Sequence, residues 1–177
     1  MSDTLSINGG TIRLIQDDIT LLKIDSFVYY ARHDLNLGSG FGGAISIRGG
    51  PSIQEELKDK GSLETTDVYV SGAGDLEMNY IVHAVGPRFQ EEDLNEKLEQ
   101  TIAKTLSAAE EKGINSIAFP PMGSGFYGVP IDVSAEITLK AVKEYLSNNP
   151  KIKDIVVCAN DRREYQACQN QLRKMGG

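Results

Sequence analysis

This sequence has few cysteines, no excess of basic residues and no long apolar run, and each shortage excludes a class of protein. Its two cysteines, Cys158 and Cys168, lack the spacing of a metal site or a disulfide framework. Lys and Arg total 18 against 25 Asp and Glu, which disfavours non-specific nucleic-acid binding because that relies on a basic surface. No apolar run approaches the roughly 20 residues that span a membrane, and the N-terminus has no secretion-signal pattern. We therefore expect a cytoplasmic protein with reduced thiols.

The length and composition of the chain are those of an ordinary globular protein. It has 177 residues, of which 40% are hydrophobic, and this is enough for one sizeable core. We expect residues 1–177 to form a single, monomeric domain. Nothing in the residue pattern indicates a bound metal or a cofactor.

Apolar runs alternate with longer amphipathic stretches along the chain. The strands are expected at residues 5–7, 11–16, 26–31, 68–71, 80–84, 116–119 and 155–159. The helices are expected at residues 42–60, 93–112, 132–147 and 161–174, with a break or kink in the first at Gly49-Gly50-Pro51 and Asp161 as the N-cap of the last. This alternation predicts an α/β fold of three layers, in which helices cover both faces of a mixed or parallel sheet.

Nearly the same glycine-rich hexapeptide occurs twice, as GSGFGG at residues 38–43 and GSGFYG at residues 123–128. Both copies match G-x-G-x-x-G, a pattern whose backbone N–H groups can close around phosphate oxygens. A single match is also typical of an ordinary flexible turn. Two matches that each follow a strand-like run and precede a helical pattern favour one shared ligand, at the carboxyl ends of the strands. Backbone donors and helix dipoles need no Lys or Arg, so a net charge of −7 does not forbid a phosphate ligand.

The two loops do not fit the common nucleotide-binding fingerprints. A Rossmann loop needs a tight turn after its strand and an acidic residue at the end of the next strand. The first loop begins seven residues after Ala31, and the acidic residues about 20 positions later, Glu55, Glu56 and Asp59, lie on the helical stretch. No Gly-Lys-Ser/Thr follows either loop, which excludes a Walker A motif.

Three stretches resemble those of the macrodomain family, whose members bind ADP-ribose. They are Asp17-Asp18-Ile19-Thr20, YIVHAVGP at residues 80–87 and AFPPMGSGFYGVP at residues 118–130. The third is the most specific, and the resemblance extends over nearly the whole chain. It implies a macrodomain-like fold with a central mixed sheet, and ADP-ribose, free or attached to a macromolecule, as the ligand.

The resemblance also implies roles for individual residues. Asp18 would accept a hydrogen bond from the adenine amino group, with the Ile19 N–H beside it; the alternative is a turn or helix cap. The two loops would clamp the diphosphate from opposite sides, and their residues are Gly38, Ser39, Gly40, Phe41 and Gly42 in one and Ser124, Gly125, Phe126 and Tyr127 in the other. Tyr127 would lie against the distal ribose, unless it is only core packing.

The chain departs from the family at three positions. Hydrolytic macrodomains carry Asn-Ala-Ala-Asn where this chain has Tyr29-Tyr30-Ala31-Arg32, and Arg32 cannot act as a general base because it stays protonated. Gly42 stands where some relatives have an acidic residue. Asn160 stands where many relatives stack an aromatic ring on adenine, and we expect Asn160 to contact the base by hydrogen bonding. Arg162 and Arg163 are then either surface charges or stacking groups.

Two functions remain open at this point. The first is a binding module for ADP-ribose, because both phosphate loops are intact and the usual catalytic Asn is missing. The second is a hydrolase that removes ADP-ribose, or the acetyl group of O-acetyl-ADP-ribose, by a substrate-assisted route with Arg32, His33 or Asp34 as weak catalytic candidates. His83 lies in a buried-strand pattern, which favours a structural imidazole. A reader of adenine-rich single strands is disfavoured by the acidic composition.

Overall fold

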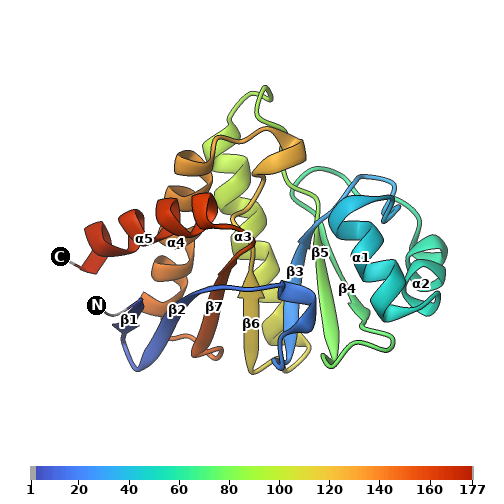
Figure 1. Cartoon of the computed structure of the whole chain (residues 1–177), viewed down its shortest axis with the longest axis horizontal. Coiled ribbons are helices and arrows are strands. Elements are labelled where there is room, and N and C mark those ends of the chain that lie inside the picture. The colour runs from blue at the N-terminus through green and yellow to red at the C-terminus, as the bar shows by residue number, and fades with distance from the viewer. Residues whose placement is uncertain (1–2, 177) are drawn as a thin grey trace.

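The computed structural model describes residues 3–176, which contain one sheet of seven strands in the order β1-β2-β7-β6-β3-β5-β4 (Figure 1). The strands are β1 (Thr4–Ile7), β2 (Gly10–Gln16), β3 (Ser26–Tyr30), β4 (Val68–Gly72), β5 (Tyr80–Ala84), β6 (Ser116–Phe119) and β7 (Asp154–Ala159). The five central strands are parallel, whereas β1 and β4 pair antiparallel at the two edges. The expected mixed sheet is confirmed.

Helices cover both faces of this sheet. They are α1 (Gly40–Gly49), α2 (Ser52–Lys60), α3 (Leu94–Glu111), α4 (Ile131–Ser147) and α5 (Arg162–Gly176), with two short 3-10 helices, η1 (Ile19–Leu21) and η2 (Gly125–Tyr127). One core joins α3, α4 and α5 to the sheet, and a second core joins α1 and α2 to the other face. The three-layer α/β/α architecture is confirmed. Among the helices between residues 3 and 176, none combines the length and apolar character needed to cross a bilayer.

The apolar spacing of the sequence explains these layers. Leu98, Ile102 and Leu106 are completely buried, because a spacing of four residues places them on one stripe of α3. On the opposite face, Ile53 and Leu57 of α2 are buried in the second core. All five residues of β3 are buried, as required of a central strand that is covered on both faces.

Most element boundaries lie within two residues of the sequence-based expectations, and the break expected at Gly49-Gly50-Pro51 is confirmed. The stretch 42–60 forms two helices, because Gly50 has a φ of 81° and Pro51 cannot donate a helical hydrogen bond. The helix α1 begins at Gly40, inside the first glycine-rich hexapeptide. The first loop is therefore the first turn of a helix. Neither η1 nor η2 was expected from the sequence.

The edge strand β4 is partly covered by α2. The Glu56 carboxylate accepts hydrogen bonds from the Gly72 N–H at 3.0 Å and from the Tyr69 hydroxyl at 2.7 Å. The Lys60 ammonium lies 5.9 Å from the centre of the Tyr69 ring, within the range of a cation–π contact.

Candidate functional site

The segments that the sequence singled out meet at one edge of the sheet. Residues 17–19 follow β2, residues 31–38 follow β3, residues 120–128 follow β6, and Asn160 follows β7. These strands are all parallel, so their carboxyl ends share that edge. Ligands of open α/β sheets bind in this location.

The first glycine-rich loop presents free backbone donors. Ser39 is the N-cap of α1, and the first amide of the helix with an acceptor is that of Gly43, which donates to the Ser39 carbonyl at 3.2 Å. Within residues 3–176, the amides of residues 40–42 have no acceptor, as expected for the first turn of a helix. The Phe41 ring packs inward against Phe27 with its centre 5.9 Å away. Only the backbone of this turn is offered to a ligand, and the helix dipole favours an anion there.

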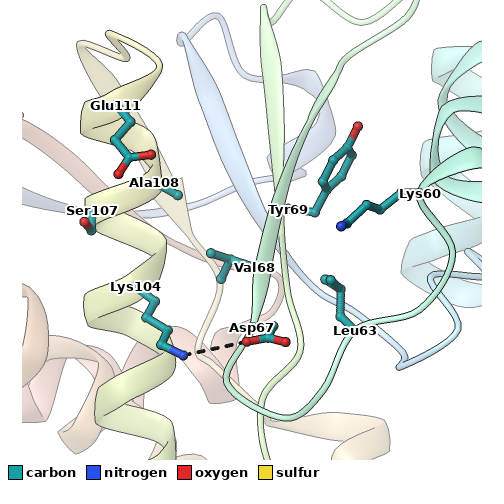
Figure 2. A pocket seen from close by; sticks show the side chains of 9 residues that line it. All are labelled: Lys60, Leu63, Asp67, Val68, Tyr69, Lys104, Ser107, Ala108 and Glu111. Atoms are coloured by element: carbon teal, nitrogen blue, oxygen red, sulfur yellow. Dashed lines mark ion pairs between the residues drawn. The ribbon is translucent and has the colours of Figure 1, made fainter.

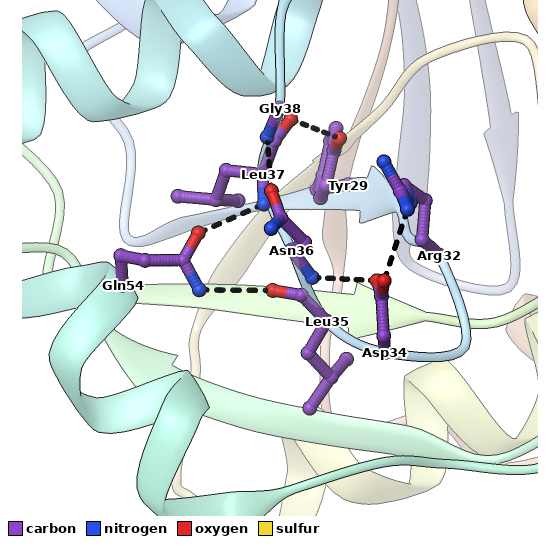
Figure 3. Close-up of polar contacts among 8 residues, drawn as sticks. All are labelled: Tyr29, Arg32, Asp34, Leu35, Asn36, Leu37, Gly38 and Gln54. Carbon is purple, nitrogen blue, oxygen red and sulfur yellow. Dashed lines mark hydrogen bonds and ion pairs between the residues drawn. The ribbon is translucent and has the colours of Figure 1, made fainter.

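Two side chains, from α2 and β3, contact the segment directly before this loop (Figure 3). The Gln54 side chain of α2 accepts from the Leu37 N–H at 2.9 Å and donates to the Leu35 carbonyl at 3.2 Å. The Tyr29 hydroxyl donates to the Leu37 carbonyl at 3.3 Å. A Cβ atom on Gly42 would lie only 1.7 Å from that carbonyl oxygen, so glycine is required there by close packing.

Arg32 lies beside the first loop. It begins a chain of polar contacts that ends at Gly38 of that loop (Figure 3). Its guanidinium donates to Asp34 at 2.9 Å, Asp34 accepts from the Asn36 N–H at 2.9 Å, and the Asn36 side chain accepts from the Gly38 N–H at 2.8 Å. A Cβ atom on Gly38 would lie 3.7 Å from Nη1 of Arg32. Arg32 therefore brings a half-exposed positive charge to the loop.

The two histidines face different surroundings. Nδ1 of His33 lies 2.9 Å from the Leu63 carbonyl, and Nε2 lies 3.4 Å from the Thr65 hydroxyl, so its ring is engaged by the segment that precedes β4. His83 is completely buried in β5, with Nε2 2.8 Å from the Ser71 hydroxyl. Burial lowers the pKa of His83 to about 3, which keeps the ring neutral and fits a structural imidazole.

The second glycine-rich loop forms the single turn η2. Gly125 has a φ of 77°, a conformation that glycine adopts without cost. No acceptor for the amides of residues 124–126 is present in the described part of the chain. Phe126 is 85% exposed, whereas Tyr127 is half-buried with its ring centre 4.7 Å from that of Tyr30. Tyr127 thus packs on the core and remains partly exposed.

Asp18 is the N-cap of η1, so the capping alternative holds for one of its oxygens. Oδ1 accepts from the Thr20 N–H at 3.0 Å and from the Thr20 hydroxyl at 2.6 Å, and Oδ2 accepts from Arg48 of α1. Burial alone would raise the pKa of Asp18, but the Thr20 and Arg48 contacts outweigh it and hold this pKa below its ordinary value. The carboxylate is 37% exposed, and Oδ2 keeps one lone pair for another donor. Ile19 is buried beside it.

Asn160 is exposed directly after β7, and its N–H donates to Glu164 Oε1 at 2.8 Å. The other oxygen of Glu164 lies 3.4 Å from the Ser124 hydroxyl, so this carboxylate joins the end of β7 to the second loop. The Asp161 side chain accepts from the Glu164 N–H at 2.8 Å, as expected of an N-cap. Arg162 and Arg163 are exposed. The contacts of Arg48 and Glu164 were missed from the sequence, because each joins residues 30 or 40 positions apart.

Two cavities lie near β4 and α2, and they differ in their relation to this site. A cavity of about 740 Å³ adjoins the first loop, with Asp34, Asn36, Gly38 and Gln54 in its wall. A second, of about 480 Å³, lies between α3 and β4, where Lys104 and Asp67 approach to 3.7 Å (Figure 2). None of the expected site residues lines the second cavity. The glycine-rich loops therefore remain the candidate site.

Comparison with known proteins identifies the family. The family model described as Macro domain matches residues 30–138, which is more than half of the sequence. The chain belongs to the macrodomain family. This macrodomain is 31% identical over 170 residues to the O-acetyl-ADP-ribose deacetylase of Cronobacter sakazakii, covering 93% of this chain and 94% of that protein.

Solved structures from Oceanobacillus iheyensis are similar to this macrodomain over nearly their full length. A macrodomain mutant with ADPR (ADP-ribose) superposes with a TM-score of 0.91 and 26% identity, covering 97% of each chain. The macrodomain of the same organism with ADP gives a TM-score of 0.90 at 26% identity, covering 97% of this chain and 95% of that one.

Proposed function

We propose that this macrodomain binds ADP-ribose, free or attached to a macromolecule, between its two glycine-rich loops. The observation that carries the proposal is the pair of glycine turns at the same edge of the sheet, where the amides of residues 40–42 and 124–126 have no acceptor in the described chain. The similarity to macrodomain structures with ADPR and with ADP supports the same ligand class here.

The diphosphate would be held by main-chain donors from both sides. Its ligands in our proposal are Gly38, Ser39, Gly40, Phe41 and Gly42 of the first loop and Ser124, Gly125 and Phe126 of the second. The Gly38 N–H already donates to Asn36, so Gly38 would contribute close backbone approach instead of a donor. The N-terminal dipole of α1 adds a favourable field for an anion. This arrangement explains how a chain with a net charge of −7 holds a dianion.

The base would bind at the end of β2. In our proposal Asp18 accepts a hydrogen bond from the adenine amino group with the remaining lone pair of Oδ2, and the Ile19 N–H donates to the ring. The depressed pKa of Asp18 keeps the carboxylate ionised, and an ionised acceptor makes a stronger hydrogen bond. Asn160, at the end of β7, would contact the base by hydrogen bonding.

The distal ribose would lie against Tyr127. The exposed part of the Tyr127 ring supports this contact, because aromatic rings pack well on the apolar face of a sugar. Arg32 lies beside the first loop and would donate to the ligand with the N–H groups that Asp34 leaves free.

Calorimetry with ADP-ribose, ADP, AMP and NAD tests the proposal. We expect ADP-ribose to bind most tightly and AMP to bind at least about tenfold more weakly, since AMP lacks the second phosphate. A single-stranded adenine oligomer is the counter-ligand. Binding of the oligomer without binding of ADP-ribose would overturn the proposal.

Removal of the acetyl group from O-acetyl-ADP-ribose, or of ADP-ribose from a modified protein, is the second candidate function. It is favoured by the similarity to the Cronobacter sakazakii deacetylase. Arg32 and Asp34 are already paired near the first loop, so a substrate-assisted reaction would use the ligand's own phosphate to position water, with Asp34 or His33 for proton transfer.

Incubation with O-acetyl-ADP-ribose and with mono-ADP-ribosylated proteins separates the two candidates. Turnover that disappears in His33→Ala or Asp34→Ala with ADP-ribose affinity retained, or that falls in Arg32→Ala by more than the affinity does, would establish the hydrolase. Tight binding without turnover on any of these substrates establishes the binding module.

A further inference from the structure

We propose that Tyr29 and Tyr30, the last two residues of β3, are positioning residues that set the gap between the two glycine-rich loops. Each tyrosine would hold one loop, so one strand end would fix both halves of the diphosphate clamp. The inference rests on the proposed function and adds the residues that determine its selectivity for a diphosphate.

The two side chains lie on opposite faces of the sheet because successive residues of a strand alternate. Tyr29 belongs to the core with α1 and α2, and Tyr30 belongs to the core with α3, α4 and α5. Both are more than nine-tenths buried. The first loop begins α1 on the Tyr29 side, and Tyr127 of the second loop packs on the Tyr30 side.

Tyr29 contacts the first loop through its hydroxyl and its ring. The hydroxyl donates to the Leu37 carbonyl at 3.3 Å, directly before the glycines (Figure 3). A Cβ atom on Gly42 would lie 2.6 Å from the same hydroxyl oxygen. The ring packs edge-on against Phe41 with centres 5.1 Å apart. The position of the first turn of α1 is thus set against this one side chain.

Tyr30 contacts the second loop through its ring, while its hydroxyl is held by the segment after β5. Its ring centre lies 4.7 Å from that of Tyr127, and a Cβ atom on Gly123 would lie 3.3 Å from its hydroxyl oxygen. The hydroxyl donates to the Pro87 carbonyl, and the ring lies so close to Gly86 that a Cβ atom there would be 2.3 Å away. The ring is therefore wedged between the segment after β5 and the second loop.

The strand that carries both tyrosines is well fixed. It is paired with β5 along its whole length and with β6 at its beginning. Because each loop contacts β3 through one of these side chains, two adjacent residues would determine the distance between the two sets of amides. A ligand with two linked phosphates gains from both loops only while that distance is kept.

The affinity ratio of ADP to AMP measures this effect, since the two ligands differ by one phosphate. In Tyr29→Phe and in Tyr30→Phe we expect the ratio to fall by about three- to tenfold, the equivalent of one net hydrogen bond. A purely structural role would lower both affinities together through the folded fraction and leave the ratio unchanged. Tyr145→Phe is the matched control, because its hydroxyl is also hydrogen-bonded, to Glu110 and the Ile152 N–H, but it lies on α4 and contacts neither loop.

Hydrogen exchange in the ADP complex gives a second readout that separates the two tyrosines. We expect faster exchange at residues 40–42 in Tyr29→Phe and at residues 125–127 in Tyr30→Phe, with little change at the other loop. An unchanged ADP to AMP ratio in both variants, with the wild type binding ADP-ribose normally, overturns the inference and leaves the proposed function intact. Failure of the wild type to bind ADP and ADP-ribose would overturn both.

Discussion

Arg48 of α1 donates from a single nitrogen to the Asp18 carboxylate and, at 2.6 Å, to the Thr20 hydroxyl. The last turn of α1 is thereby tied to η1, while the first turn of the same helix carries the first glycine-rich loop. The proposed base and phosphate contacts are thus joined by one helix of ten residues. Arg48 also completes the contacts that keep Asp18 ionised.

Replacement of Asp18 by alanine tests the proposed recognition of the base. We expect Asp18→Ala to weaken ADP-ribose binding by about 1.5–3 kcal/mol, the range for a hydrogen bond to a charged group. The hypoxanthine analogue of ADP-ribose has a carbonyl instead of the amino group, so its affinity should change little. Calorimetry with both ligands provides the measurement. Asp154→Ala is the control, because Asp154 is similarly exposed and paired with Arg13. Equal losses for the two ligands would contradict the assignment of Asp18.

Gly125 and Gly113 offer a matched test of the second loop. Both have left-handed φ angles, 77° and 72°, and a Cβ atom on either would meet no atom within 4 Å. Valine at either position should destabilise the fold by about 1–3 kcal/mol through backbone strain. Only Gly125→Val should abolish ADP-ribose binding, because only this loop would direct its amides at the ligand. A folded Gly125→Val protein with wild-type affinity would rule out the clamp.

Gly42 and Gly43 provide the corresponding test for the first loop. A Cβ atom on Gly42 would lie 1.7 Å from the Leu37 carbonyl oxygen, whereas one on Gly43 would be 3.4 Å from its nearest neighbour. Gly42→Ala should therefore displace the segment before α1, cost about 1–3 kcal/mol of stability and weaken ADP-ribose binding at least about tenfold. Gly43→Ala should be close to wild type. Urea unfolding and calorimetry measure the two effects, and equal behaviour of the variants would argue against the observed packing.

The buried imidazole of His83 predicts an acid sensitivity of the fold. Its pKa is about 3 in the folded chain against an ordinary value of 6.5, so below pH 6.5 the unfolded chain binds a proton that the folded chain does not. The free energy of unfolding should therefore fall as the pH is lowered, approaching about 1.4 kcal/mol per pH unit. Urea unfolding between about pH 7 and pH 5 measures this slope.

His83→Gln is the comparison for this prediction, because it removes the titrating group and keeps a polar side chain. Its stability should be nearly independent of pH over the same interval. Asp3 and Asp18, whose pKa values are lowered, contribute stability that is lost only at more acidic pH. The same slope in both proteins would show that another group is responsible.

Local spacing was enough to predict the order of the elements and the location of the glycine-rich loops. The four-residue spacing of Leu98, Ile102 and Leu106 fixed the buried face of α3, because helical periodicity is a property of neighbouring residues. The expectation that His83 is structural followed in the same way from its place in an apolar strand.

The details of the site were less accessible because they depend on residues far apart in the sequence. Arg48 reaches Asp18 from 30 positions away, and Glu164 reaches Ser124 from 40 positions away. Such contacts exist only after the strands have taken their order in the sheet, and no local pattern encodes them. The different directions of two neighbouring side chains were also not predicted from local sequence. The His33 ring contacts Leu63, and Arg32 lies beside the first loop.

The hydrogen bond from Gly72 to Glu56 affects how another chain could pair with the β4 edge of the sheet. An open sheet edge is a template on which another chain can add a strand and start a polymer. Here the Gly72 amide already donates to the Glu56 carboxylate, and the Lys60 ammonium lies over the Tyr69 ring of the same strand. An incoming strand that pairs at Gly72 would first have to displace the Glu56 carboxylate into water. The Glu56 contact therefore withholds the Gly72 donor from a second chain at this end of β4.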